Sequence, residues 1–104
     1  MKMKTVRTSA LKYAKRVRIL ASEYEDGSLY VGILTMSGED YCDITTHLQS
    51  LPVPFGFVEC NSDAERFIFE QKLANDAQQV IKSGFKTYRM YRFNIDDPAM
   101  KEVG

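Results

Sequence analysis

Three side chains that could support nucleophilic or acid–base catalysis fall in one short stretch, residues 41–48, with the sequence YCDITTHL. They are Cys42, Asp43 and His47. The stretch has the alternating pattern of a β-strand, in which successive side chains point to opposite faces. Cys42 and His47 would then face apart, and Asp43 would lie about 13 Å from His47 along the strand. We therefore expect no Cys–His or Asp–His pair within this strand, and a structural or exposed histidine.

The acidic residues Glu39, Asp40 and Asp43 are a second candidate for chemistry. Neighbouring carboxylates can act as an acid–base pair or hold a divalent cation. The sequence at residues 37–40, SGED, is also typical of a turn, which accounts for Glu39 and Asp40 by itself. We therefore favour a solvated turn. The chain contains no catalytic motif such as GxSxG, a P-loop, GxGxxG or HExxH, and we expect it not to be an enzyme.

The two cysteines, Cys42 and Cys60, and the single histidine, His47, are too few for a four-ligand zinc site. A free cysteine packs as a small hydrophobic residue, so we interpret both as reduced, buried thiols. Their spacing leaves a disulfide open, because a disulfide depends on the distance between the two Cα atoms in the fold. We expect no cofactor and no metal ion.

Aromatic and basic residues alternate in a strand-like stretch near the C-terminus. Such a pattern can form a platform for single-stranded nucleic acid. The residues that would contact it are Lys86, Tyr88, Arg89 and Arg92. However, no RNP-like sequence accompanies them, Tyr88 shares a predicted face with Met90, and nearby acids would repel phosphates. We therefore expect a packed sheet surface here, and nucleic acid only as an alternative partner.

The elements that must position these residues are mostly β-strands. Alternation of apolar and polar residues predicts strands, and turn sequences such as EDG and SGED separate the first three of them. The expected strands begin at Arg16 and then cover residues 29–36, 41–48, 55–60 and 86–94. Residues 49–54, which lie between the strands at 41–48 and 55–60, contain two prolines and are expected to be a loop.

One helix is predicted over about residues 62–74. Ser62 with Glu65 three residues later fits a capping box, and acidic residues in the first turn suit the positive end of the helix dipole. Phe67 and Ile68 belong to an apolar stripe that would cover a sheet face. We therefore predict an α+β fold, with an antiparallel sheet of about four to five strands and this helix packed on one face.

The chain of 104 residues is long enough for one domain, which we place at residues 15–95. Residues 1–14 are predicted to be a basic arm or a short helix capped by Ser9, and residues 96–104 a loose tail. No apolar run approaches the roughly 18 residues of a membrane span, and the N-terminus lacks the pattern of a signal peptide. We expect no membrane contact and a cytoplasmic location.

The net charge is zero, but the charges are unevenly distributed along the chain. Residues 1–20 carry seven basic side chains and no acid, whereas residues 21–76 carry eleven acids against two bases, a net charge of −9. Residues 77–95 are basic again. This pattern matters for binding only if the two signs also separate in space. The alternative is that strands from the two ends pair with the acidic middle and neutralise it.

Three sequence blocks follow one another, namely GEDYCDITTHL at residues 38–48, FGFVECNSDAERFI at 55–68 and SGFKTYRMYRFN at 83–94. With the DG turn and apolar strand before them, these blocks resemble an uncharacterised family of small proteins carried by conjugative elements, plasmids and phages of gut bacteria. The resemblance covers about residues 15–95.

The chain departs from the pattern of this family at His47, Lys86 and Arg89, where Asn, Cys and Pro are usual. These changes and the N-terminal arm make the two ends more basic than the family pattern. No catalytic residues are assigned in the family, so none is transferred to this chain. The resemblance implies an accessory gene of a mobile element in a bacterial cell.

Small size, the lack of a catalytic motif and this implied setting lead to our first hypothesis. It is a non-enzymatic protein that binds a host protein and inhibits a defence nuclease, of anti-restriction or anti-CRISPR type. Carboxylates of the acidic middle would occupy the basic nucleic-acid groove of the nuclease. The candidate contact residues are Glu39, Asp40, Asp43, Glu59 and Asp63. The alternatives are a self-associating module of element transfer, such as a homodimer, and a small nucleic-acid-binding protein.

Overall fold

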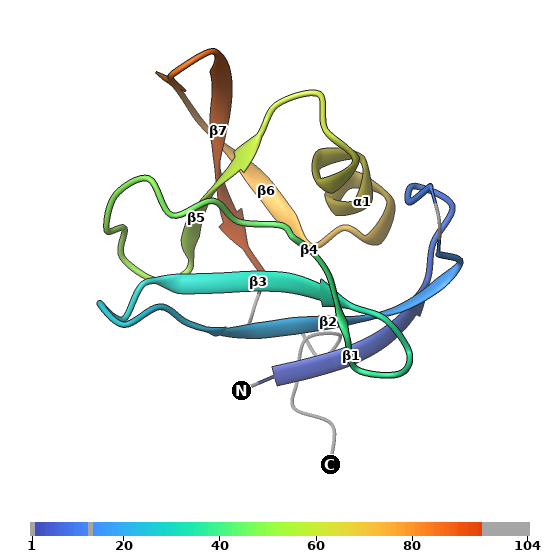
Figure 1. The fold of residues 1–104 in the computed structure, drawn as a ribbon. Helices are drawn as coiled ribbons and strands as arrows, with labels where there is room; N and C mark the ends of the chain where they lie inside the picture. The colour runs from blue at the N-terminus through green and yellow to red at the C-terminus, as the bar shows by residue number, and fades with distance from the viewer. Residues whose placement is uncertain (1, 13, 95–104) are drawn as a thin grey trace.

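The computed structural model describes residues 2–12 and 14–94, in which seven antiparallel strands form two sheets and one helix packs against them (Figure 1). This confirms the predicted α+β class. The first sheet has the strand order β1-β2-β3-β4 and the second β5-β7-β6. The elements are β1 (Lys2–Arg7), β2 (Arg16–Glu23), β3 (Leu29–Leu34), β4 (Asp40–Asp43), β5 (Phe55–Glu59), α1 (Asp63–Gln71), β6 (Ala74–Ser83) and β7 (Lys86–Phe93).

The first sheet is a meander whose inner face carries alternate apolar residues. β2 pairs with β3 in the register Ile19↔Ile33 and Ala21↔Val31, and all four side chains are buried. The period of two that the sequence predicts from Arg16 onward is therefore confirmed in β2. Between β2 and β3, Gly27 has a φ of 85°, which an L-residue with a side chain rarely adopts, so the Asp–Gly turn forms as expected.

The core lies where the inner face of the first sheet, the second sheet and α1 meet. Its fully buried residues come from all three: Val17, Ile19, Val31, Val58, Phe67, Ile68 and Tyr91. Burial of apolar surface is the main favourable term in folding. The helix therefore contributes to one core that it shares with both sheets.

Ser62 caps α1 as the sequence predicts. Its hydroxyl accepts the N–H of Glu65 at 3.2 Å, while the Glu65 carboxylate accepts the N–H of Asn61 at 3.0 Å. The helix ends at Gln71, before the predicted end at 74. The reason is that Lys72 adopts the left-handed conformation, with φ of 55°, and its N–H closes the last helical turn.

The N-terminal segment departs from the prediction, because it forms β1 and no helix capped by Ser9. β1 pairs antiparallel with β2 along its whole length, in a register that places Val6 opposite Val17. This pairing gives hydrogen-bond partners to the backbone donors and acceptors along the edge of β2, which would otherwise be exposed. The loop after β1 is closed by a bond of 2.8 Å from the N–H of Thr8 to the carbonyl of Lys15.

Two sheets replace the single predicted sheet, mainly because of β6. The sequence of β6, ANDAQQVIKS, is mostly polar and its side chains are largely exposed, so its pattern predicted no strand. It nevertheless pairs with β7 through a tight turn, with Ser83 opposite Lys86. A bulge between Asp76 and Val80, where Gln78 has a φ of 62°, also breaks the alternation that would have indicated a strand.

The third predicted strand is shorter than expected, because β4 ends at Asp43. The N–H of Thr45 donates to the carbonyl of Val31 at 3.1 Å, which turns the chain inward. Thr45 is therefore only 2% exposed. Just beyond it, Thr46 forms an isolated bridge to Phe57 of β5 and so connects the two sheets.

The described residues contain no helix that is long and apolar enough to cross a membrane. The predicted loose tail at residues 96–104 lies outside them.

Candidate protein-binding site

Three of the five predicted contact acids line one hollow of about 240 Å³. Asp43 comes from the end of β4, Glu59 from the end of β5 and Asp63 from the first residue of α1. Apolar side chains complete much of the lining, namely Leu11, Tyr41, Cys42, Ile44 and Ala64. We call this feature the acidic hollow. It combines apolar surface with carboxylates that come from three separate elements.

Asp43 is held at the edge of the acidic hollow by Tyr30, whose phenol donates to Asp43 Oδ1 at 2.7 Å. Gly32 stands opposite Asp43 in β3, and its missing side chain leaves room for the ring. A Cβ at Gly32 would lie 2.1 Å from the Tyr30 oxygen. Burial and the bond to Asp43 raise the pKa of Tyr30 well above its usual value, so the phenol remains a donor. This contact fixes the direction of the Asp43 carboxylate.

Glu59 and Asp63 each take part in an ion pair at the surface. Lys86 Nζ lies 2.9 Å from Glu59 Oε1, and Arg66 pairs with Asp63 one helical turn away. The four side chains are between 38% and 62% exposed. Exposed ion pairs contribute only about 0–1 kcal/mol. A basic group of a binding partner could therefore replace either cation at small cost.

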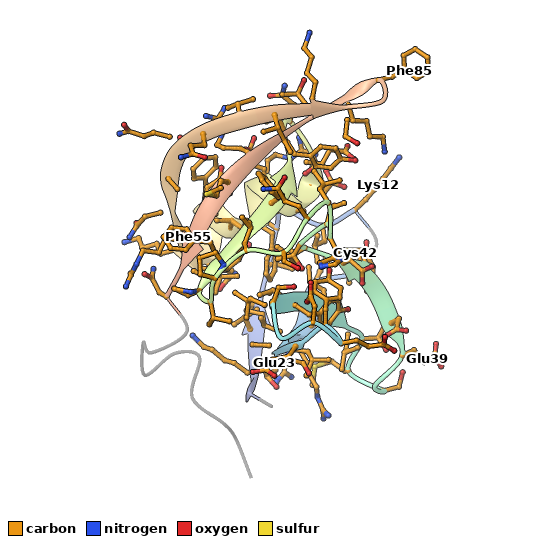
Figure 2. All side chains as sticks on the ribbon, turned by 90° about the vertical axis from the view of Figure 1, so that its left-hand side faces the viewer. Lys12, Glu23, Glu39, Cys42, Phe55 and Phe85 are labelled. Carbon is orange, nitrogen blue, oxygen red and sulfur yellow. The ribbon has the colours of Figure 1, made fainter. Side chains whose placement is uncertain are left out.

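The other two predicted acids, Glu39 and Asp40, do not line the acidic hollow. Glu39 lies on the turn between β3 and β4 (Figure 2). Asp40 is the first residue of β4. The turn is the one that the sequence predicts, and its backbone is tied by a bond of 2.8 Å from the N–H of Thr35 to the carbonyl of Glu39. Both acids are exposed and extend the negative surface along β4.

The four residues considered for a nucleic-acid platform do not form one open surface. Arg89 donates to two carboxylates, at 3.3 and 3.1 Å, and Lys86 is paired with Glu59. Tyr88 is only 8% exposed, so its ring is not available for stacking. Arg92 is exposed. Because a stacking platform needs open aromatic faces, this geometry argues against base binding on β7.

A second hollow, with the opposite charge, lies beside the loop between β1 and β2. It is a groove of about 1020 Å³, lined by the basic side chains of Arg7, Lys12, Lys15 and Arg16. We call it the basic groove. Leu11 of this loop lines both the basic groove and the acidic hollow. The segregation of charge along the sequence therefore survives in space at this end of the molecule.

Glu70 is the carboxylate in the basic groove, and it ties the β1–β2 loop to α1. Its Oε2 accepts the N–H and the hydroxyl of Ser9, both at 2.7 Å, and its Oε1 accepts the hydroxyl of Thr8. Burial acts to raise the pKa of Glu70, but these hydrogen bonds outweigh it and lower the pKa from 4.5 to about 2. The ionised carboxylate is thus the form that holds the loop.

Glu70→Gln is expected to destabilise the protein at neutral pH and to have less effect in acid. Because its pKa is lowered in the folded state, ionised Glu70 contributes to the free energy of unfolding. This contribution is complete above pH 4.5 and is lost as the pH falls towards about 2. Because Glu70 is exposed, we expect a difference of no more than about 1 kcal/mol at pH 7. Urea unfolding of both proteins at pH 7 and pH 3 measures it. A difference that is the same at both pH values would contradict this role.

His47 has a carboxylate partner that local spacing did not indicate. Its Nε2 lies 2.9 Å from Asp26 Oδ2, and its ring packs on Tyr24 with centroids 4.4 Å apart. Asp26 also accepts two bonds from Ser28 and one from Ser50. These hydrogen bonds hold the pKa of Asp26 well below its usual range, and the bonds from Ser28 and Ser50 have the largest effect. The two residues lie 21 positions apart, so only the fold brings them together.

The Asp26 cluster resembles a catalytic triad in composition but differs from one in connectivity. In a triad the histidine accepts the proton of the serine hydroxyl. Here the hydroxyls of Ser28 and Ser50 donate to the carboxylate of Asp26, which is a weak base when its pKa is low. The arrangement does not activate a nucleophile. It ties the loop that follows β4 to the turn between β2 and β3.

The thiols of Cys42 and Cys60 are free and half-buried, so the disulfide that the spacing left open is not formed. Burial raises the pKa of Cys42, which keeps it protonated and a poor nucleophile. Among the residues that the structure describes, no group of three or more His, Cys, Asp or Glu side chains is placed to hold a metal ion.

Comparison with known proteins adds no further information on the site, because no family model, curated protein or solved structure matches the chain. The resemblance described above therefore stays a prediction.

Proposed function

We propose that this chain is a non-enzymatic accessory protein that binds a basic segment of another protein in its acidic hollow. The observation that carries the proposal is the convergence of Asp43, Glu59 and Asp63 around an apolar lining. The three acids lie far apart in the sequence and come from different elements. Their meeting at one hollow places negative charge beside apolar surface, and both are needed to receive a basic side chain with an apolar stem or neighbour.

Charge gives this site a definite mode of recognition. Glu39 and Asp40 extend the negative surface from the acidic hollow along β4. A surface of one sign accelerates association with a partner of the opposite sign and makes binding sensitive to salt. The apolar lining adds contact area that does not depend on salt. Binding should therefore be fast at low ionic strength and weaken when salt is raised.

The class of partner follows from the resemblance to mobile-element proteins. We propose a host defence component in the bacterial cytoplasm, such as a restriction or CRISPR nuclease, whose nucleic-acid groove is basic. Carboxylates seated in that groove would exclude the nucleic acid by competition. Inhibition by this route needs no catalytic residue, cofactor or metal ion in the inhibitor.

For the second candidate function, nucleic-acid binding, we consider the basic groove as the contact surface in place of β7. Four basic side chains along a groove of about 1020 Å³ have the charge needed to contact a phosphate backbone. The ionised Glu70 in the same groove works against it, since it would repel phosphates. We therefore rank this function below protein binding.

One capture experiment tests the proposal against this alternative. The tagged chain is incubated with nuclease-treated bacterial lysate, washed at low and at high salt, and its partners are identified by mass spectrometry. We expect a defined protein that is released at high salt. The double variant Asp43→Lys/Asp63→Lys should reduce its recovery at least about tenfold, because two rim charges are reversed. The matched control, Lys15→Glu/Arg16→Glu in the basic groove, should leave recovery unchanged.

Circular dichroism and thermal unfolding first establish that both double variants are folded. Unchanged capture by the hollow variant would exclude the acidic hollow as the binding site. If the groove variant instead loses its partner, and binding of the wild type to single-stranded DNA falls steeply with salt, the nucleic-acid function is supported in its place.

A further inference from the structure

The turn between β6 and β7 carries an aromatic side chain that the fold does not use. Phe85 is fully exposed in the turn that joins Ser83 to Lys86. β5 ends opposite Tyr88, so the turn extends beyond the edge of its sheet. Figure 2 shows the ring of Phe85 pointing away from the rest of the molecule. We call residues 82–86 the hairpin tip.

Folding does not explain the phenylalanine at this position. Gly84, with a φ of 65°, provides the backbone conformation that the tight turn requires. Phe85 buries no surface within its own chain, and turn positions more commonly carry small polar residues. A rigid, exposed aromatic ring on a projecting turn is the kind of side chain that serves as an anchor in protein interfaces. The exposed ring is therefore suited to contact another protein.

The charges beside Phe85 indicate what kind of pocket it fits. Lys82 and Lys86, which precede and follow Phe85 in the hairpin tip, are both exposed. A complementary site would be an apolar hollow with carboxylates at its edge. The acidic hollow of the same chain has both properties, because half-buried Ala64 and the acids Asp43 and Asp63 are among the residues that line it.

We propose that the hairpin tip of one copy of this chain docks in the acidic hollow of a second copy, to form a homodimer. This inference rests on the proposed function, in which the acidic hollow is a protein-binding site. Lys86 follows Phe85 directly and bonds Glu59 at 2.9 Å, so each tip lies next to the hollow of its own chain. Two copies related by a two-fold axis can then exchange tips, which closes the assembly at two.

The size of the contact predicts its strength. Each buried phenylalanine removes about 150–250 Å² from water, and two docked rings give less than the roughly 1,200 Å² of a small stable interface. We therefore expect a weak, concentration-dependent dimer, with a dissociation constant between about 10 μM and about 1 mM. A host protein that binds the acidic hollow would compete with the second copy.

Sedimentation velocity across this concentration range tests the dimer. Phe85→Ser should weaken dimerisation at least about tenfold, because it removes the anchor from a turn that Gly84 still supports. The matched control is Phe69→Ser on α1, whose ring is 63% exposed but lies outside the hairpin tip. It should leave dimerisation unchanged. A wild-type protein that stays monomeric throughout, or a dimer that persists in Phe85→Ser, would overturn the inference.

A mixing experiment identifies the site that receives the tip. Asp63→Lys alters the acidic hollow, and alone it should also lose the dimer. A mixture of Phe85→Ser and Asp63→Lys should recover part of the association, above that of either variant alone, because one of the two docking contacts of the wild type can form. No recovery would contradict docking in the acidic hollow. Capture of a host protein by Phe85→Ser but not by Asp43→Lys/Asp63→Lys would keep the proposed function even if the wild type is monomeric.

Discussion

Glu65→Ala is expected to lower the free energy of unfolding by about 3 kcal/mol, although it removes a charged side chain. Glu65 is only 8% exposed, an unusual environment for a carboxylate. It accepts the phenol of Tyr91 at 2.8 Å, the Nε–H of Arg89 at 3.3 Å and the N–H of Asn61 at 3.0 Å. Its loss leaves these donors without their acceptor.

The buried phenol of Tyr91 accounts for much of this expected cost. Tyr91 is completely buried, so no water can replace the lost carboxylate at its hydroxyl. An unsatisfied buried donor costs about 1–3 kcal/mol. Burial and the bond to Glu65 raise the pKa of Tyr91 well above its usual value, which keeps the phenol a donor. The same carboxylate also restrains Arg89, whose side chain remains 34% exposed.

Urea unfolding at neutral pH measures the effect of Glu65→Ala. The matched control is Asp63→Ala, which removes a carboxylate from the same turn of α1 but breaks only the exposed pair with Arg66. We expect the control to cost about 1 kcal/mol or less. A loss for Glu65→Ala no larger than that of the control would show that the buried network does not stabilise the fold.

The sequence predicted the elements whose stabilising contacts are local. The Ser62 cap and Glu65 three residues later indicated the start of α1, and the structure shows both hydrogen bonds. Alternation in β2 and the glycine of the turn at Gly27 likewise indicated the first hairpin. Each of these signals depends on residues a few positions apart, so no knowledge of the fold was needed.

Long-range pairing explains what the sequence could not predict. β6 is polar because it lies at an edge, and it forms a strand because β7 supplies its hydrogen-bond partners. β1 likewise depends on β2. Neither strand has an apolar face that a pattern could reveal. Because β1 and β6 were not predicted, the sequence suggested a single sheet of four to five strands. The structure has two sheets.

The same limit applies to the candidate site. Composition and turns indicated five acids, but only the fold selects Asp43, Glu59 and Asp63 for one hollow. Nor does any local signal relate His47 to Asp26, because the contact depends on the loop that returns after β4. Sequence reasoning identified residues with suitable chemistry, and the tertiary structure determined which of them meet.

The sequence allowed two interpretations of the charge pattern, neutralisation by pairing and separation of the two signs in space. Each describes one end of the chain. The C-terminal bases Lys86 and Arg89 pair with acids of the middle segment, as expected for mutual neutralisation. In contrast, the N-terminal bases Arg7, Lys15 and Arg16 gather along the basic groove. The protein with zero net charge therefore still presents an acidic hollow and a basic groove.

Phe67→Ala is expected to lower the free energy of unfolding by about 3–5 kcal/mol, at least as much as Glu65→Ala. Phe67 is completely buried and belongs to the core cluster that includes Ile19 of the first sheet and Tyr91 of the second. Truncation would remove apolar contacts and leave a cavity that the surrounding strands cannot fill without moving. Since the helix shares one core with both sheets, the loss should destabilise the whole domain in a single transition.

A neighbour on the same helix provides the control. Phe69 lies two residues further along α1, has the same chemistry and is 63% exposed, with only an edge contact to Tyr91 at a centroid distance of 6.4 Å. Phe69→Ala should cost about 1 kcal/mol or less, because little apolar area is returned to water and no cavity forms. Helix propensity changes in the same direction in both variants, so it cannot produce the difference. Similar losses in urea unfolding would mean that α1 does not hold the two sheets through its buried face. Two separate transitions in Phe67→Ala would show instead that each sheet is stable without the other.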